Sequence, residues 1–160
     1  KGLEDAVYVA NKLQERLNVW GYIQDKKYVS LIENLDSSRL LSWRGFLKTN
    51  KLQEELCHCR ALINTPKWNE AYGNVVVEAM ACGVPVVAYR RGGPSEIIKH
   101  GLTGFLVDPD NKNELLQYVR KINLIDRYKC RNWVENNASS NIFADKVETW
   151  LKKIFENFNN

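Results

Sequence analysis

Two carboxylates, Glu70 and Glu78, stand eight positions apart in the segment NEAYGNVVVEAMACGVPVVAY, residues 69–89. They bracket a glycine and a run of valines, and Glu78 lies in a stretch whose other residues favour burial. A buried charge is costly unless something pairs with it. A carboxylate accepts hydrogen bonds from two neighbouring hydroxyl groups well, so each of these residues could hold a polyol.

Gly73 lies between the two carboxylates, where helical spacing begins. The N-terminus of a helix binds anions, phosphate above all, and a glycine there lets a phosphate approach the backbone. Glu78 is expected about 7.5 Å further along the helix axis, on the same face as Asn74. A ligand with a central diphosphate on the amides of Gly73 to Val75 and a polyol at each end fits this layout, which describes a nucleotide sugar.

A plainer alternative explains the same residues. Glu78 could face solvent on an amphipathic helix, and Glu70 could be an ordinary loop residue. The spacing of the two residues does not decide between these interpretations.

The elements that must position these residues follow from the apolar pattern, which alternates between helical and strand periods. We predict strands at residues 17–20, 40–43, 61–65, 85–89 and 104–107, and helices at 3–13, 28–35, 52–59, 73–81, 94–100, 112–122, 126–136 and 142–157. This alternation predicts an α/β fold, a Rossmann-like doubly wound parallel sheet with helices on both faces. Ligands of such sheets bind at the carboxyl ends of the strands, here after Gly21, Gly45, Thr65 and Tyr89.

The chain opens on a helix, whereas the first strand of a doubly wound sheet is usually central. We therefore expect the first strand, and a preceding domain, to lie outside the sequence. A gap or an unpaired edge should mark the place of that strand.

Composition bounds the remaining possibilities. The 160 residues suit one domain, residues 1–160, with 44% hydrophobic and 26% charged residues, which is ordinary for a globular protein. A net charge of +4 without a dense Lys/Arg block argues against nucleic acid as a partner. No apolar run is long enough for a transmembrane segment.

The four cysteines favour reduced thiols in a cytoplasmic protein. Cys57, His58 and Cys59 match no common zinc spacing, so we expect no metal site there. His58 is expected to be structural or exposed.

The segment EAYGNVVVEAMACGVPVVA, followed by GGPSEII and GLTGFLV, resembles the donor-binding half of retaining GT-B glycosyltransferases of family four, the glycosyl transferases group 1. The resemblance covers most of the chain and is most specific from Thr65 to Pro109. Lys1 and Gly2 look like the end of the family's first-loop motif, and Gly21 in WGYIQDKKY matches a glycine of its second-strand segment.

The resemblance implies a role for each matched position. Glu70 would be catalytic, binding hexose hydroxyls nearest the reacting centre, and Glu78 would bind the ribose hydroxyls. Lys1 would help to neutralise the leaving phosphate. The other implied donor-binding residues are Gly21, Phe46 and Leu47 near the nucleobase, and Tyr72, Gly73, Asn74 and Val75 around the diphosphate.

A supporting role is implied for the segment YRRGGPSE, through Arg91, Gly92, Gly93 and Glu96. The two glycines could expose amides to the donor sugar or its phosphate. Alternatively they form a tight turn into the helix at Pro94, with solvated arginines, and we favour that interpretation for Arg90. No cofactor and no metal are expected for this chemistry.

The function that follows is binding of a nucleotide-diphosphate sugar, UDP-glucose or similar, for retaining transfer of a hexose to an acceptor. The acceptor is unknown and would bind the absent N-terminal domain, so the chain alone is expected to be inactive. Peripheral membrane contact of the full protein is left open. Two alternatives are a catalytically silent nucleotide-sugar-binding or regulatory module and a nucleotide-sugar epimerase-like enzyme; the lack of a G-x-G-x-x-G motif lowers the case for an NAD enzyme.

Overall fold

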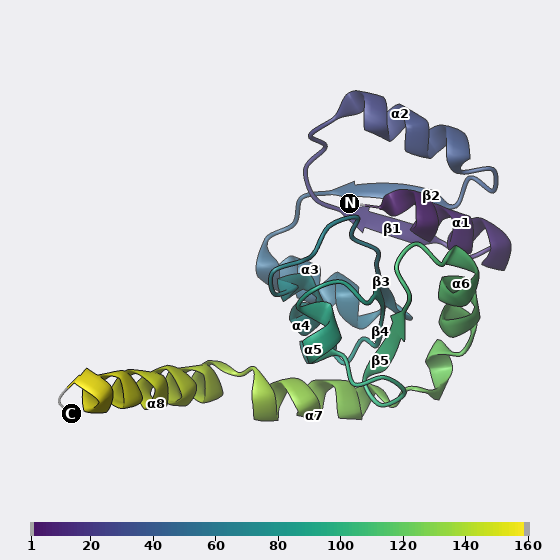
Figure 1. Cartoon of the computed structure of the whole chain (residues 1–160). Coiled ribbons are helices and arrows are strands. Elements are labelled where there is room, and N and C mark those ends of the chain that lie inside the picture. The colour runs from purple at the N-terminus through teal and green to yellow at the C-terminus, as the bar shows by residue number, and fades with distance from the viewer. Residues whose placement is uncertain (1, 159–160) are drawn as a thin grey trace.

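The computed structural model describes residues 2–158. Strands and helices alternate through the first two thirds of the chain, and helices follow (Figure 1). The elements in chain order are α1 Leu3–Leu13, β1 Leu17–Trp20, α2 Lys26–Leu35, β2 Leu41–Gly45, α3 Thr49–Cys57, β3 Leu62–Asn64, α4 Asn74–Ala81, β4 Val86–Tyr89, α5 Pro94–Ile97, β5 Gly104–Val107, α6 Lys112–Arg120, the 3-10 helix η1 Ile122–Leu124, α7 Arg127–Asn137 and α8 Ser140–Phe158.

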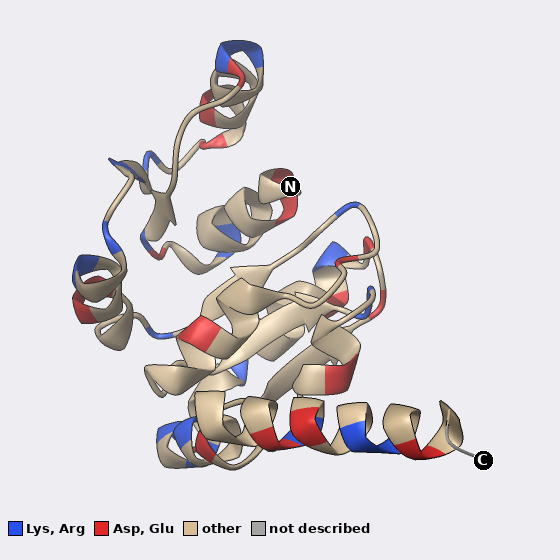
Figure 2. Cartoon of the chain, turned by 90° about the vertical axis from the view of Figure 1, so that its left-hand side faces the viewer, with Lys and Arg blue, Asp and Glu red and all other residues tan. Residues whose placement is uncertain are grey.

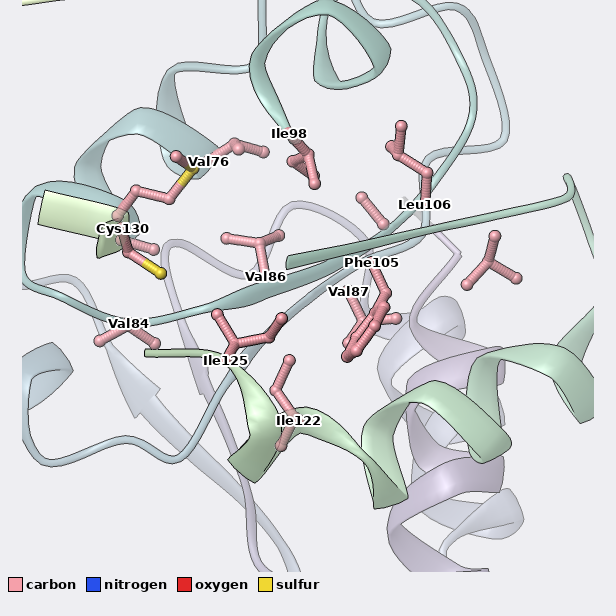
Figure 3. Close-up of a cluster of buried hydrophobic side chains, with 14 of the residues drawn as sticks. Val76, Val84, Val86, Val87, Ile98, Phe105, Leu106, Ile122, Ile125 and Cys130 are labelled. Atoms are coloured by element: carbon pink, nitrogen blue, oxygen red, sulfur yellow. The ribbon is translucent and has the colours of Figure 1, made fainter. Parts of the chain in front are cut away.

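The core lies around the sheet β3-β4-β5, in which both strand pairs are parallel. Every residue of β4 and β5 is buried, which explains their continuous apolar runs. Helix α4 packs on β3 and β4, and α6 packs on β4 and β5. Val76 of α4, Val86 and Val87 of β4 and Phe105 of β5 meet in the buried cluster of Figure 3.

The second sheet contains only β1 and β2, which are also parallel. Its residues are half-buried or exposed, in contrast to those of β4 and β5. Within residues 2–158, no strand joins the free edge of β1 to the free edge of β3. The five parallel strands and the doubly wound class are as predicted, and the break between β1 and β3 is the gap that the sequence analysis expected.

Some boundaries differ from the prediction. Helix α5 ends at Ile97 instead of residue 100, because Ile98 is extended and the following residues turn toward β5. The predicted helix 112–122 ends at Arg120 and is followed by the short η1.

Helix α8 projects away from the rest of the chain (Figure 1) and buries none of its residues. Its apolar side chains, Trp150 and Phe155 among them, are 61% and 66% exposed. These side chains of α8 therefore lie outside the core. No helix among the described residues combines the length and the apolar character needed to cross a membrane.

The ribbon of Figure 2 shows acidic and basic residues interspersed along the helices and loops. Six of the eight ion pairs among the described residues involve a carboxylate whose side chain is at least 48% exposed. Pairs at such positions add little to stability. The fold therefore depends on the apolar cluster around β4.

Adjacent valines on α4 test this dependence. Val76 is fully buried, whereas Val75 is 51% exposed. We expect Val76→Ala to lower the free energy of unfolding by about 1.5 kcal/mol or more, at about 0.8 kcal/mol per methyl group plus a cavity cost. Val75→Ala is the control, because it changes helix propensity equally and should be near neutral. Urea denaturation measures both, and equal losses would contradict the burial argument.

Candidate functional site

The N-terminus of α4 is open to a ligand. Its N-cap is Gly73, in the left-handed region at φ 94°, and no side chain caps it. By contrast, Asp25, Asn111 and Asp126 cap α2, α6 and α7 with their side chains. Among the described residues, the backbone N–H groups from Tyr72 to Val75 have no hydrogen-bond partner. Together they form a row of free donors at the positive end of the helix dipole.

Two glycines hold the loop before α4 in place. The Gly93 N–H donates to the Glu70 carbonyl at 2.8 Å, and Gly92 forms a parallel bridge with Glu70. A Cβ on Gly92 would lie 2.0 Å from the Glu70 carbonyl oxygen, and one on Gly93 would lie 2.1 Å from that of Tyr72. Only glycine permits this approach, so Gly92 and Gly93 position the loop that carries Glu70. Direct contact of these glycines with a donor stays a prediction.

Neither carboxylate is buried. Glu70 is half-buried and Glu78 is exposed, and within residues 2–158 neither side chain makes a hydrogen bond or an ion pair. The burial cost that raised the question about Glu78 is therefore absent. Both carboxylates are free to accept hydrogen bonds from a ligand.

The exposed face of α4 carries Asn74, Val75 and Glu78. At 100° per residue, Val75 shares the outer face of the helix with Glu78, while Val76, Ala79 and Met80 take the core side. Val75 and Glu78 line a cavity of about 610 Å³ that extends to β1 and β3. Tyr72 is 50% exposed beside the start of α4.

A charged network that the sequence analysis missed lies behind the Glu70 loop. Lys67 Nζ contacts Asp5 Oδ2 at 2.6 Å and Asp110 Oδ1 at 2.8 Å. Arg91 pairs with the other oxygen of Asp110 and donates to the Pro66 carbonyl at 2.8 Å. The Tyr89 hydroxyl donates to Asp5 at 2.8 Å, and Lys67 and Arg91 both lie over the Tyr89 ring. The network ties α1 to the loops that follow β3, β4 and β5.

The network shifts the pKa values of its ionisable groups, Asp110 and Tyr89 among them. The hydrogen bond from Lys67, with Arg91 beside it, lowers the pKa of Asp110. Burial, followed by the hydrogen bond to Asp5, raises the pKa of Tyr89. Asp110 therefore stays ionised and Tyr89 stays neutral over the physiological range. Arg91 is paired with Asp110, a contact that no local motif indicates because the two residues are 19 positions apart.

A second group of predicted residues lies at the carboxyl ends of β1 and β2. The Gly21 N–H donates to the Gly45 carbonyl at 2.9 Å. Phe46 is 56% exposed and stacks on Tyr22, with ring centroids 4.7 Å apart and planes at 8°. Tyr22 was not predicted, although its place after Gly21 at a strand end was a signal. Leu47 follows Phe46 and is half-buried.

The start of α1 adjoins the end of β3. The Thr65 hydroxyl donates to the Gly2 carbonyl at 2.7 Å, and a Cβ on Gly2 would lie 1.9 Å from the Thr65 carbonyl oxygen. The Leu3 N–H donates to the Tyr28 hydroxyl, and that hydroxyl donates to Glu4. Burial and the bond to Glu4 raise the pKa of Tyr28 to about 12. The predicted phosphate ligand Lys1 lies outside the described residues.

The remaining predicted residue, Glu96, is exposed on α5. Its own carboxylate has no hydrogen-bond or ion-pair partner among the described residues. The described residues contain no cluster of three His, Cys, Asp or Glu side chains that could hold a metal ion. The four cysteines are free thiols, and Cys130 is the buried one.

Solved structures share this architecture. A sucrose-phosphate synthase from Thermosynechococcus elongatus superposes with a TM-score of 0.81 at 21% identity, over 98% of this chain and 43% of that one. The Anabaena protein HepE, crystallised with UDP-glucose, superposes with a TM-score of 0.79 at 23% identity, over 95% of this chain and 45% of that one. These likenesses define the fold as one half of a GT-B glycosyltransferase.

The family is established from the sequence as well. The family model described as glycosyl transferases group 1 matches residues 1–140, so the chain belongs to that family. Sucrose synthase isoform 2 of Daucus carota is 34% identical over 133 residues, which are 79% of this chain and 16% of that protein. Sucrose synthase 2 of Pisum sativum is 34% identical over 137 residues. The chain thus spans about a sixth of the length of these relatives.

A substitution at Gly93 tests how the Glu70 loop is held. We expect Gly93→Ala to displace residues 70–73, because its methyl group would overlap the Tyr72 carbonyl. NMR amide shifts of residues 70–76 should change. Gly101→Ala is the control, since no atom of the described residues lies within 4 Å of the position that its Cβ would take. The alanine would be strained only by its left-handed φ of 79°, which costs about 1–2 kcal/mol. Unchanged shifts in Gly93→Ala would refute the proposed constraint.

Proposed function

We propose that this chain is the donor-binding domain of a retaining hexosyltransferase that uses a nucleotide-diphosphate sugar, with UDP-glucose as the first candidate. Membership of the glycosyl transferases group 1 family supports a transferase. The UDP-glucose complex of the structural neighbour HepE supports the donor class. A cytoplasmic location remains a prediction.

The observation that carries the proposal is the row of free N–H groups from Tyr72 to Val75, flanked by two unpaired carboxylates. A diphosphate on this row would accept hydrogen bonds at the positive end of α4. The exposed Glu78 is then placed for the ribose hydroxyls. The half-buried Glu70, held by Gly92 and Gly93, is placed for the hexose hydroxyls.

Breaking the bond between the sugar and the phosphate builds negative charge on the departing diphosphate. Fixed dipoles aimed at that charge stabilise the transition state without having to reorganise. The free amides before α4 supply such dipoles, and Lys1 would add a positive charge. The chain's contribution to catalysis in this proposal is thus stabilisation of the leaving group and orientation of the sugar by Glu70.

Removing each charge separately tests the assignment. We expect Glu78→Gln to weaken UDP-glucose binding, because the ribose contacts form in the ground state. Glu70→Gln should mainly lower kcat, because Glu70 lies by the reacting sugar. A hydrogen bond to a charged group is worth about 1.5–3 kcal/mol, so each effect should be roughly tenfold to a hundredfold. Calorimetry and donor turnover, both carried out on the full-length enzyme, measure the two effects.

Glu148→Gln is the matched control for this pair. Glu148 is an exposed glutamate on α8 whose one ion pair within residues 2–158 is with Lys152, so its loss should leave binding and turnover unchanged. If Glu70→Gln and Glu78→Gln both behave like this control, the donor site lies elsewhere. GDP-mannose, tested in parallel with UDP-glucose, decides between these two candidate donors.

Metal independence is part of the same proposal. Backbone dipoles and Lys1 are expected to balance the diphosphate charge without a divalent ion. Turnover should therefore survive an excess of EDTA. Loss of activity with EDTA, restored by Mg²⁺ or Mn²⁺, would show that a metal carries this charge instead.

A further inference from the structure

Asp110 lies in the loop between β5 and α6 and holds two basic residues at once. Its Oδ1 accepts a hydrogen bond from Lys67 Nζ at 2.8 Å, and its Oδ2 pairs with Arg91. Each oxygen of the carboxylate is therefore engaged by a different cation. Charge-assisted bonds of this kind fix the direction of both partners as well as balancing their charge.

The two cations belong to the two backbone segments that meet at the candidate site. Lys67 lies three positions before Glu70. Arg91 lies two positions before Gly93. The hydrogen bond from the Gly93 N–H to the Glu70 carbonyl joins these segments. Asp110 thus links both sides of this contact, although it belongs to neither of them.

Further bonds keep both cations in place. Arg91 also donates to the Pro66 carbonyl at 2.8 Å, and its side chain is only 18% exposed. Lys67 also contacts Asp5 of α1 at 2.6 Å. An isolated surface ion pair contributes little, but several charges joined in a network with fixed geometry can hold a loop.

The Asp110 carboxylate has no local role within its own loop. Helix α6 is capped by the side chain of Asn111, which accepts from the Glu114 N–H at 3.1 Å. The carboxylate bonds instead to Lys67 and Arg91, which are 43 and 19 positions away. Its contacts therefore serve the tertiary arrangement of the loops and not the start of α6.

The backbone of Asp110 points to the same conclusion. Its φ is 64°, in the left-handed region, and among the described non-glycine residues only Gln14 and Arg39 share a positive φ. Aspartate adopts this conformation more readily than most residues, yet glycine fits it better. Backbone considerations alone would thus favour glycine here, and the bonds to two cations are what the aspartate side chain adds.

We propose that Asp110 is a positioning residue for the transfer reaction, which clamps the Glu70 loop, residues 66–73, to residues 90–93 through Lys67 and Arg91. This inference rests on the proposed function, in which Glu70 holds the hexose hydroxyls. Asp110 acts on the backbone that carries Glu70 and does not itself contact the donor. A small displacement of a group that orients a substrate is enough to slow a reaction strongly.

The clamp acts on Glu70 more than on α4. Val76 and Met80 are fully buried, and α4 packs on β3 and β4, so the helix keeps its place without Asp110. Glu78 is part of that helix and keeps its place with it. Loss of the clamp should therefore disturb the orientation of the sugar and leave most of the donor binding intact.

Hydrogen exchange at the Gly93 amide measures the clamp directly, because this amide donates to the Glu70 carbonyl. In the full-length enzyme, Asp110→Gly should speed exchange at Gly93 by about tenfold or more, since both segments lose their common partner. The amide of Val87 in the buried strand β4 is the internal reference and should not change. Unchanged exchange at Gly93 would overturn the proposal.

Turnover of the same full-length enzyme tests the effect on the reaction. With UDP-glucose as donor, Asp110→Gly should lower kcat roughly tenfold and change KM by less than about threefold. Calorimetry should give the same number of UDP-glucose sites per molecule as in the wild type, which shows that the lower kcat does not reflect a smaller folded fraction. A normal kcat despite faster exchange at Gly93 would show that the clamp does not position Glu70.

Arg39→Gly is the matched control. Arg39 is exposed in the turn between α2 and β2, and its φ of 55° is also left-handed. The substitution therefore makes the same backbone change as Asp110→Gly, away from the clamped loops. It should leave exchange at Gly93 and kcat unchanged. Equal effects of the two substitutions would mean that the carboxylate is not responsible.

The two measurements separate this inference from the proposed function. If the wild-type enzyme turns over neither UDP-glucose nor GDP-mannose, the proposed donor and the positioning role fail together, and exchange at Gly93 still shows whether Asp110 clamps the loop. If the wild type is active and Asp110→Gly matches it, the proposed function stands and the positioning role fails.

Discussion

The contact on which the candidate site depends is the close approach of two backbone segments, residues 70–72 and residues 92–93. One hydrogen bond, from the Gly93 N–H to the Glu70 carbonyl, joins them, and the absence of side chains on Gly92 and Gly93 makes the approach feasible. The start of α4, its free N–H groups and the placement of Glu70 all follow from it. A site made of backbone dipoles is only as well defined as the backbone that carries them.

Much of this could be predicted from the sequence, because local patterns determined it. The apolar runs at residues 86–89 and 104–107 identified the buried strands, and Gly73 identified the start of α4. The position of Val75 could not be assigned, because a short run of valines has no periodicity. Glu78 points toward solvent because Val76, Ala79 and Met80 fill the core side of α4. The sequence pattern alone does not determine this orientation.

Contacts between residues far apart in the chain could not be predicted from the sequence. Lys67 bonds to Asp5, which is 62 positions away in the chain, and to Asp110, which is 43 positions away. No short sequence motif predicts such a network. Gly92 and Gly93 were recognised as a turn or as exposed amides, but their partner segment was not. The grouping of the strands into two sheets could not be predicted either, since the apolar pattern of a strand does not identify the strands that pair with its edges.

The projection of α8 has a consequence for how stability is distributed along the chain. A helix that buries none of its 19 residues gains little from tertiary packing, which supplies most of the stability of helices in proteins. The strands β4 and β5, fully buried, stand at the opposite extreme. We therefore expect a gradient of local stability, highest in the buried centre around β4 and lowest in the C-terminal helix α8. Any surface that covers Trp150 and Phe155 would extend that cooperative centre by one element.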